Sequence, residues 1–318
     1  MVKYLIIQLD KTSTSYCHFE NLSTEYQLIS LDDLKAGIFY GMKENLTIQF
    51  VHPDYELPQE YKEAIDSIDH SNIISSLCED VSLKEEADIV VFHEWTGLEY
   101  YSFNAEKAYV LRTSKEDFFN RYLFLKEVLG KVGRLNVVFT DVDTFTDSDF
   151  EKYKQILTTL SKIIEDLYVE GKSPQLNLLT DRMMLTAMNN CNAGWENITL
   201  APDGKFYVCP AFYHEGADSI GSLEEGLDIK NPQLYRLDHA PICRHCDAYQ
   251  CKRCIWLNRK MTLEVNTPSH EQCVMAHLER NASRELLQNI RKHGTLLPEQ
   301  EDIKEIDYLD PFDKRDEW

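Results

Sequence analysis

The placement of the cysteines constrains this chain more than any other feature of its sequence. Seven of the nine fall between residues 191 and 273, and four of them read Cys243-x2-Cys246-x4-Cys251-x2-Cys254. Two thiols that stand two residues apart can reach one metal centre from a tight turn, so paired Cys-x-x-Cys units are typical of metal sites. Disulfide bonding is the competing use of so many thiols.

Composition favours metal or redox chemistry over disulfides. The first ten residues, MVKYLIIQLD, hold one lysine and an apolar run too short for a secretory signal. We therefore expect a reducing cytoplasm, where disulfides are rare. The formal net charge of −21 argues against nucleic acid and anionic membrane surfaces as partners, because both attract Lys and Arg. No run approaches the roughly 20 apolar residues of a membrane span.

Short apolar runs alternate with amphipathic helical patterns through the first 185 residues. The runs predict strands at residues 4–9, 46–51, 88–92, 108–111, 135–140 and 175–179. Apolar side chains recur every three or four positions from residue 150 to residue 167, which predicts a long helix with one buried stripe. A shorter stripe of Phe118, Tyr122, Leu123 and Leu125 follows Ser114, a suitable N-cap. This alternation predicts an α/β fold with a mostly parallel sheet, either open or part of a barrel.

Polar residues follow the expected strands. Parallel strands bring their carboxyl ends to one edge of the sheet, where α/β proteins place ligand sites. The candidate substrate residues at this edge are Asp10, His52, His93, Glu94, Arg112, Asp141 and Asp143. The plainer interpretation, which we favour for any single position, is a helix cap or a solvated turn.

A β-hairpin is expected shortly after Cys191. Residues 197–208 read NITLAPDGKFYV, two apolar strands on either side of a Pro-Asp-Gly turn. The turn would bring Cys191 and Cys209 close together at the open end of the hairpin. A helical stretch is expected next, before the segment with four cysteines.

These cysteines resemble the pattern of the SPASM domain, which follows the catalytic barrel of radical SAM peptide-modifying enzymes. Cys191, Gly204 and Cys209 fit its first part, Cys-x9–15-Gly-x4-Cys. The four cysteines at 243–254 fit its second part, Cys-x2-Cys-x5-Cys-x3-Cys, with each of the last two spacings one residue short. Cys273 supplies the last cysteine.

The resemblance implies two [4Fe–4S] clusters, for which soft, electron-donating thiolates are suitable ligands. It assigns one cluster to Cys243, Cys246, Cys251 and Cys273, and the other to Cys191, Cys209 and Cys254. Two such clusters need eight ligands against these seven cysteines. One iron would therefore be open, or held by His214, His245 or Asp247.

Zinc is the alternative metal. The four cysteines at 243–254 alone could make an all-cysteine zinc site. Zinc would leave the pattern of Cys191, Gly204 and Cys209 unexplained, so we favour iron–sulfur clusters.

A radical SAM enzyme carries CxxxCxxC in the loop after its first strand, and the cluster bound there chelates S-adenosylmethionine. The corresponding loop here reads DKTSTSYCHFEN, with Cys17 in the middle position and Ser13 and Glu20 in the other two. One thiol cannot hold that cluster, so we do not expect this chain alone to cleave S-adenosylmethionine. For Cys17 and Cys78 the plainer interpretation is a small, partly buried thiol.

The whole chain is similar to the CXXX repeat peptide maturase family. Members accompany a radical SAM maturase and a small precursor peptide with repeated Cys-x-x-x units. The resemblance implies a peptide maturation protein that binds the precursor or the partner enzyme. The alternatives are a stand-alone peptide-modifying enzyme that uses an open cluster iron, and a zinc-stapled interaction protein.

The expected domains follow from these patterns. Residues 1–185 would form a radical-SAM-like partial (β/α)6 barrel or open parallel sheet. Residues 186–297 would form a small Cys-rich SPASM-type domain with a β-hairpin and a C-terminal helix. Residues 298–318 would form an acidic tail.

Overall fold

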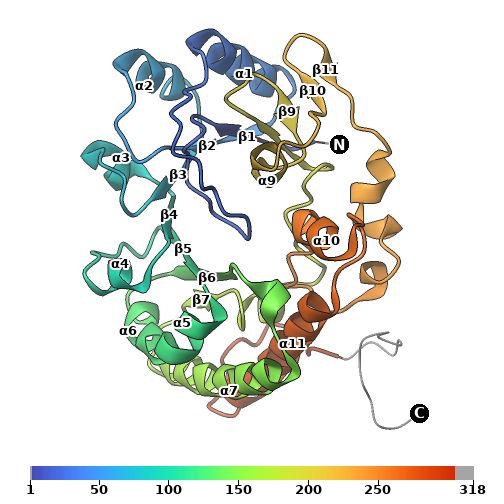
Figure 1. Cartoon of the computed structure of the whole chain (residues 1–318). Helices are drawn as coiled ribbons and strands as arrows, with labels where there is room; N and C mark the ends of the chain where they lie inside the picture. The colour runs from blue at the N-terminus through green and yellow to red at the C-terminus, as the bar shows by residue number, and fades with distance from the viewer. Residues whose placement is uncertain (1, 305–318) are drawn as a thin grey trace. The chain divides into compact units, whose positions relative to one another are not determined.

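The structure, a computed structural model, describes residues 2–304 (Figure 1). The chain divides into two compact units, and each unit is assembled from two separate stretches of sequence. The first unit joins Met1–His93 to Cys191–His239, and the second joins Glu94–Asn190 to the chain from Ala240 onward. The predicted domain boundaries at residues 185 and 297 stay predictions. Residues 305–318, most of the predicted acidic tail, lie outside the described residues.

The first unit contains a mostly parallel sheet. Its strands are β4 (Ile89–Phe92), β3 (Ser71–Ser75), β2 (Thr47–Val51), β1 (Tyr4–Gln8), β8 (Asn197–Leu200) and β9 (Phe206–Tyr207), in their order across the sheet. All neighbours pair parallel except β8 and β9, which form the predicted antiparallel hairpin. Four of the five residues of β1 and of β3 are buried, as expected for parallel strands that are covered on both faces.

Strand β3 is absent from the sequence-based prediction. Its sequence SNIIS has only two apolar residues, which is too short a run to stand out. The polar Asn72 is nevertheless buried, because its backbone N–H donates to Asp88 Oδ2 at 2.8 Å and its Oδ1 accepts from His52 Nε2 at 2.8 Å.

The helices of the first unit are short apart from α1. They are α1 (Leu31–Lys43), α2 (Gln59–Ile65), α3 (Val81–Glu86) and α9 (Pro210–His214). The predicted helical stretch before the four cysteines is wrong, because this segment forms a small ladder and two 3-10 turns. These elements are β10 (Gly221–Ser222), β11 (Gly226–Leu227), η3 (Pro232–Tyr235) and η4 (Leu237–His239). Pro232 starts η3 but has no N–H to donate, and Asn231 before it adopts a left-handed φ of 48°. A longer helix therefore does not extend across this position.

The second unit contains three parallel strands and the longest helices. The strands are β5 (Ala108–Thr113), β6 (Arg134–Phe139) and β7 (Gln175–Leu176). The helices are α4 (Trp95–Glu99), α5 (Lys115–Arg121), η1 (Tyr122–Phe124), α6 (Leu125–Leu129), η2 (Val142–Thr144), α7 (Asp147–Val169), α8 (Asp181–Met184), η5 (Cys243–His245), α10 (Ile255–Thr262) and α11 (His270–Arg291). Helix α11 packs along α7 (Figure 1). No helix among residues 2–304 is long and apolar enough to cross a bilayer.

Helix α7 is the long helix predicted from the stripe at residues 150–167. Thr146 and Asp149 form a reciprocal capping box at its start, which satisfies two backbone N–H groups. Seven of the eight apolar residues in the predicted stripe are buried, and Ile163 is partly buried. The α/β class with a mostly parallel sheet is therefore confirmed, together with the helix that covers it.

Two details of the prediction are wrong. Leu123, assigned to the buried stripe near Phe118, is 60% exposed, because η1 interrupts the α-helical period between α5 and α6. Arg112 does not follow its strand but lies inside β5, which runs on to Thr113, and it is buried.

Candidate metal centres

All nine cysteines lie in the described part of the chain, and none of them forms a disulfide. The first unit contains four of them and the second unit contains five. Those of the first unit are Cys17, Cys78, Cys191 and Cys209, and those of the second are Cys243, Cys246, Cys251, Cys254 and Cys273. The thiols predicted to bind metal are thus divided between two units, and each group is described within its own unit.

The hairpin places two thiols of the first unit together. Gly204 takes φ = +75° in the turn between β8 and β9, a conformation that an L side chain adopts only with strain. Cys209 ends the hairpin and immediately precedes α9, where its carbonyl accepts from Phe212 N at 3.1 Å. Burial raises the pKa of the Cys209 thiol well above its usual range, and the neighbouring Cys17 and Cys191 thiols raise it further. Cys191 thus influences Cys209 electrostatically, while the close approach of the two thiols stays a prediction.

The third thiol of this group, Cys17, comes from the loop after β1. The phenol of the half-buried Tyr16 has its pKa raised well above its usual range, first by desolvation and then by the charges of Cys17, Cys209 and Cys191. Sequence spacing could not join Cys17 to the other two, since only the pairing of β8 beside β1 brings these segments together.

The other two positions of the degenerate CxxxCxxC loop have different roles. Ser13 is fully buried; its Oγ donates to the carbonyl of Val51 at 2.8 Å and accepts from Asp10 N at 3.0 Å. Glu20 is exposed. The buried position of Ser13 is thus used to attach the loop to β2.

Three candidate substrate residues lie at the carboxyl ends of strands in the first unit. Asp10 is buried and accepts from Thr12 at 2.6 Å and from the Tyr55 hydroxyl at 3.0 Å. His52 is buried as well, and burial lowers its pKa to about 4. His93 is exposed, with its Nε2 2.8 Å from the Thr14 hydroxyl. Asp10 and His52 therefore organise the loop and the sheet, while His93 faces solvent.

The other four candidates belong to the second unit. Arg112 lies within β5, and Glu94 is exposed at the start of α4. Asp141 accepts from the backbone N–H of Lys115 with both carboxylate oxygens, at 3.0 and 3.1 Å, and burial raises its pKa. Asp143 forms an ion pair with Lys260 at 2.8 Å. The two aspartates thus hold α5 and α10, in line with the plainer interpretation.

Three thiols gather in the second unit. Burial raises the pKa of Cys243 to about 11 and that of Cys251 to about 12, and Cys246 adds to both shifts. Cys246 Sγ lies 3.5 Å from His277 Nε2. His277 follows Cys273 by four residues on α11, so both side chains lie on one face of that helix. Cys273 therefore belongs to the helix face that meets Cys246.

Buried polar groups hold the loop of these cysteines. Asp247 Oδ1 accepts from Arg280 Nη1 at 2.7 Å, and its backbone carbonyl accepts from Arg182 Nε at 2.6 Å. Gln250 Nε2 donates to the carbonyl of Ala276 at 2.7 Å. A loop held this way presents its thiols in a defined arrangement, as a cluster site requires.

The non-cysteine ligands suggested by the sequence differ in their surroundings. His214 is partly buried in α9, where Gln8 Nε2 donates to its Nε2 at 2.7 Å, and burial lowers its pKa to about 4. His245 is exposed. Asp247 keeps its Oδ2 buried and without a hydrogen-bond partner among the described residues. Asp247 is thus the candidate whose Oδ2 could serve as a metal ligand.

Two further residues at this site were missed by the sequence analysis. His277 had a usable signal, its position four residues after Cys273. Arg253 is buried at a left-handed φ of 42°, and its positive charge lowers the pKa of Cys243. A guanidinium beside these thiols favours their thiolate form, which is the metal-binding form.

The arrangement of the thiols bears on which metal centre they fit. Over the described residues, no group of three or more His, Cys, Asp or Glu side chains converges on one metal-ion position. Structural zinc needs four ligands within about 2.3 Å of one ion. An iron–sulfur cluster takes each thiolate on a different iron atom. The choice between iron–sulfur clusters and zinc therefore stays a prediction from the sequence.

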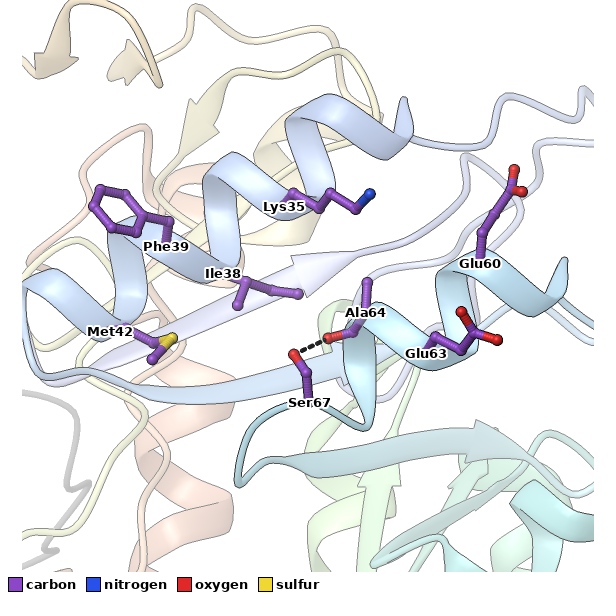
Figure 2. A pocket seen from close by; sticks show the side chains of 8 residues that line it. All are labelled: Lys35, Ile38, Phe39, Met42, Glu60, Glu63, Ala64 and Ser67. Carbon is purple, nitrogen blue, oxygen red and sulfur yellow. Dashed lines mark hydrogen bonds between the residues drawn. The ribbon is translucent and has the colours of Figure 1, made fainter.

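A groove between α1 and α2 lies outside both thiol groups. Its volume is about 390 Å³, and its lining includes Ile38, Phe39 and Met42 of α1 and Ala64 of α2. Figure 2 shows Ile38 extending toward α2 and the ring of Phe39 turned away from it. Phe39 is 68% exposed. The groove contains none of the cysteines or candidate substrate residues, so we do not assign the function to it.

Comparison with known proteins decides the fold. No protein-family model matches the sequence, and no curated protein matches it. The structure of hexahistidine-tagged anSMEcpe with bound AdoMet matches with a TM-score of 0.64 at 11% identity, covering 92% of this chain and 100% of that chain. The chain shares the fold of anSMEcpe. Native anSMEcpe with bound AdoMet and Cp18Cys peptide also matches, with a TM-score of 0.60 at 12% identity and the same coverage. These matches confirm the predicted radical-SAM-like fold class.

Proposed function

We propose that this chain is a peptide maturation protein of a ribosomally synthesised, post-translationally modified peptide system. It binds a precursor peptide with repeated Cys-x-x-x units, a radical SAM partner enzyme, or both, in the reducing cytoplasm. The observation that carries the proposal is the presence of two groups of neighbouring thiols on the fold of anSMEcpe. The peptide bound in the anSMEcpe structure supports a peptide as the ligand class.

The chain's own residues fit auxiliary iron–sulfur clusters. Cys191 and Cys209 are held by the hairpin, and Cys243, Cys246 and Cys251 by the loop on α11. We include Cys273, whose helix face meets Cys246, while the ligand role of Cys254 stays a prediction from the resemblance. Bound clusters would supply redox centres and, at an incomplete site, an open iron for a substrate thiolate.

The loop after β1 supports an accessory role. Ser13 is buried with hydrogen bonds to Asp10 and to Val51 of β2, and Glu20 is exposed, so the loop offers one thiol where S-adenosylmethionine chelation needs a three-thiolate cluster. The net charge of −21 favours neutral or basic peptides and partners.

Anaerobic peptide binding tests this proposal. A fluorescent peptide of three Cys-x-x-x repeats is titrated with cluster-loaded protein, and a matched peptide with Ser at each Cys position is the control. We expect the Cys-repeat peptide to bind at least about tenfold more tightly, a difference of about 1.4 kcal/mol. Equal or absent binding of both peptides would contradict a role in precursor binding and leave the radical SAM partner enzyme as the proposed ligand.

Two outcomes would favour the alternatives. A mass change in the Cys-repeat peptide after incubation with this chain alone would show a stand-alone enzyme. Cleavage of S-adenosylmethionine by the reduced protein would contradict the interpretation of the loop at Ser13 and Glu20.

A further inference from the structure

We propose that the groove between α1 and α2, here called the α1–α2 groove, docks a basic amphipathic helix of a partner protein. The inference goes beyond the proposed function, because the lining of this groove includes none of the thiols or predicted ligands. The partner helix would lay its apolar side chains on α1 and place Lys or Arg beside α2.

Helix α1 packs closely on the sheet of the first unit. A Cβ added at Gly37 would lie 2.4 Å from Leu200 Cδ2 of β8, and one added at Gly41 would lie 2.6 Å from Ile48 Cδ1 of β2. Both distances are shorter than an ordinary carbon–carbon contact, so the backbone of α1 rests directly on these strands. The opposite side of α1 is left to form one wall of the groove.

Helix α2 is fixed close to the start of α1. Its buried Tyr61 donates its hydroxyl hydrogen to the carbonyl of Ile29 at 2.7 Å. Ser30, the next residue, caps α1 by accepting from Asp33 N at 3.0 Å. The two walls are thus held in place before a partner arrives, which reduces the ordering cost of binding.

The α1 wall presents apolar side chains to solvent (Figure 2). Phe39 is 68% exposed and Met42 is 60% exposed, and the buried Ile38 lines the groove between them and α2. The lining part of α1 runs from Lys35 to Met42, about 10 Å along the helix axis. Anchor side chains at positions i and i+7 of a second helix span the same length, so a helix fits this wall.

The α2 wall is acidic. Glu60 and Glu63 line the groove, are exposed, and form no ion pair with any described residue. The one lysine of α2, Lys62, forms ion pairs with Glu56 and Asp80 instead, both at 2.7 Å. The carboxylates of the groove are therefore available to positive charges of a partner.

The charges select the kind of occupant. Two carboxylates in the lining outnumber the single ammonium of Lys35, and the whole chain has a net charge of −21. This field attracts a basic segment, whereas a second copy of the chain would bring the same acidic helices against it. A helix with an apolar stripe flanked by Lys or Arg complements both walls.

Fluorescence anisotropy with the full chain tests the inference. The probe is a labelled peptide of about 14 residues, with Leu at helical spacing on one face and Lys elsewhere. One control peptide has Glu in place of Lys, and the other has the same Leu and Lys in scrambled order. We expect the Leu/Lys helix to bind at least about tenfold more tightly than either control.

Surface variants separate the groove from the general charge of the chain. Phe39→Ala should weaken binding about tenfold, whereas Leu77→Ala, at 69% exposure in the same unit, should leave it unchanged. Glu60→Lys should weaken binding about threefold and Lys35→Glu should strengthen it by a similar factor. Glu86→Lys, on the exposed side of α3, is the charge-matched control and should have a smaller effect than Glu60→Lys.

Photo-crosslinking of the wild type avoids any change in folding. A benzophenone on the apolar face of the Leu/Lys peptide should label residues of α1 or α2, as seen by mass spectrometry. Labelling confined to other elements, equal binding of the three peptides, or unchanged affinity in Phe39→Ala would overturn the inference. A wild-type dimer that Phe39→Ala abolishes would also overturn it, because a second copy would then occupy the groove.

Discussion

His52 should make the first unit lose stability as the pH falls below 6.5. Its burial lowers the pKa from 6.5 to about 4, so the folded state keeps the imidazole neutral while the unfolded chain binds a proton. The stabilisation is thus complete above pH 6.5 and is lost as the pH falls through 4. Proton linkage gives a loss of about 1.3 kcal/mol between pH 7.5 and 5.5, and a limit of about 3.4 kcal/mol below pH 4.

Urea unfolding of the wild type and His52→Asn at these two pH values measures the effect. The variant is expected to be less stable at pH 7.5, because it loses the buried ring and its hydrogen bond to Asn72. That stability difference should shrink by about 1.3 kcal/mol at pH 5.5, because only the wild type has the histidine to protonate. His239→Asn, at an exposed position of the same unit, is the control and should leave the pH dependence unchanged. A pH-independent difference, or an NMR titration of His52 near pH 6.5, would refute the reasoning.

Three other changes have defined outcomes. The pKa of Glu279 is raised to about 7, mainly by burial, so its stabilising effect is complete below pH 4.5 and is lost as the pH rises through 7. Between pH 6 and 8 the wild type should therefore lose about 1.3 kcal/mol more of its free energy of unfolding than Glu279→Gln loses, as measured by thermal unfolding. Parallel pH dependences of the two proteins would contradict this. Gly204→Ala should lower the free energy of unfolding by about 1–2 kcal/mol because of its left-handed φ, and by more because the new Cβ would lie 3.2 Å from the Asp33 carboxylate. Gly171→Ala, at φ = +81° in open space, should show only the loss from the left-handed φ. Urea titrations measure both losses. Asp247→Ala should cost about 3 kcal/mol by leaving the charge of Arg280 buried, and adding Arg280→Met should recover much of that loss in a double-mutant cycle.

Apolar runs predicted the architecture because burial on both faces makes parallel strands continuously hydrophobic. The residues of β1 and β4 are of this kind, and the stripe of α7 has the helical period that a covering helix needs. Strand β3 was missed because the buried Asn72 is satisfied by hydrogen bonds with His52 and Asp88, which are distant in sequence and leave no local pattern. Leu123 was misplaced because a 3-10 turn shifts the helical period.

The candidate site, like the fold, was predictable from the sequence only where it depends on local structure. Spacing predicted the hairpin with Gly204 and the loop with Cys243, because both depend on local turns. The effect of Cys17 on the pKa of Cys209 depends on β8 pairing beside β1, a contact between distant segments. His277 reaches Cys246 only because α11 packs under the loop. Such long-range contacts are set by tertiary structure and leave no spacing rule in the chain.

We propose above that the cysteines of this chain hold iron–sulfur clusters on a fold shared with anSMEcpe. The most direct test is the iron, sulfide and zinc content per chain after anaerobic purification and reconstitution. We expect a brown protein with about eight irons and eight sulfides per chain, the content of two four-iron clusters. A colourless protein that contains zinc and no sulfide would contradict it.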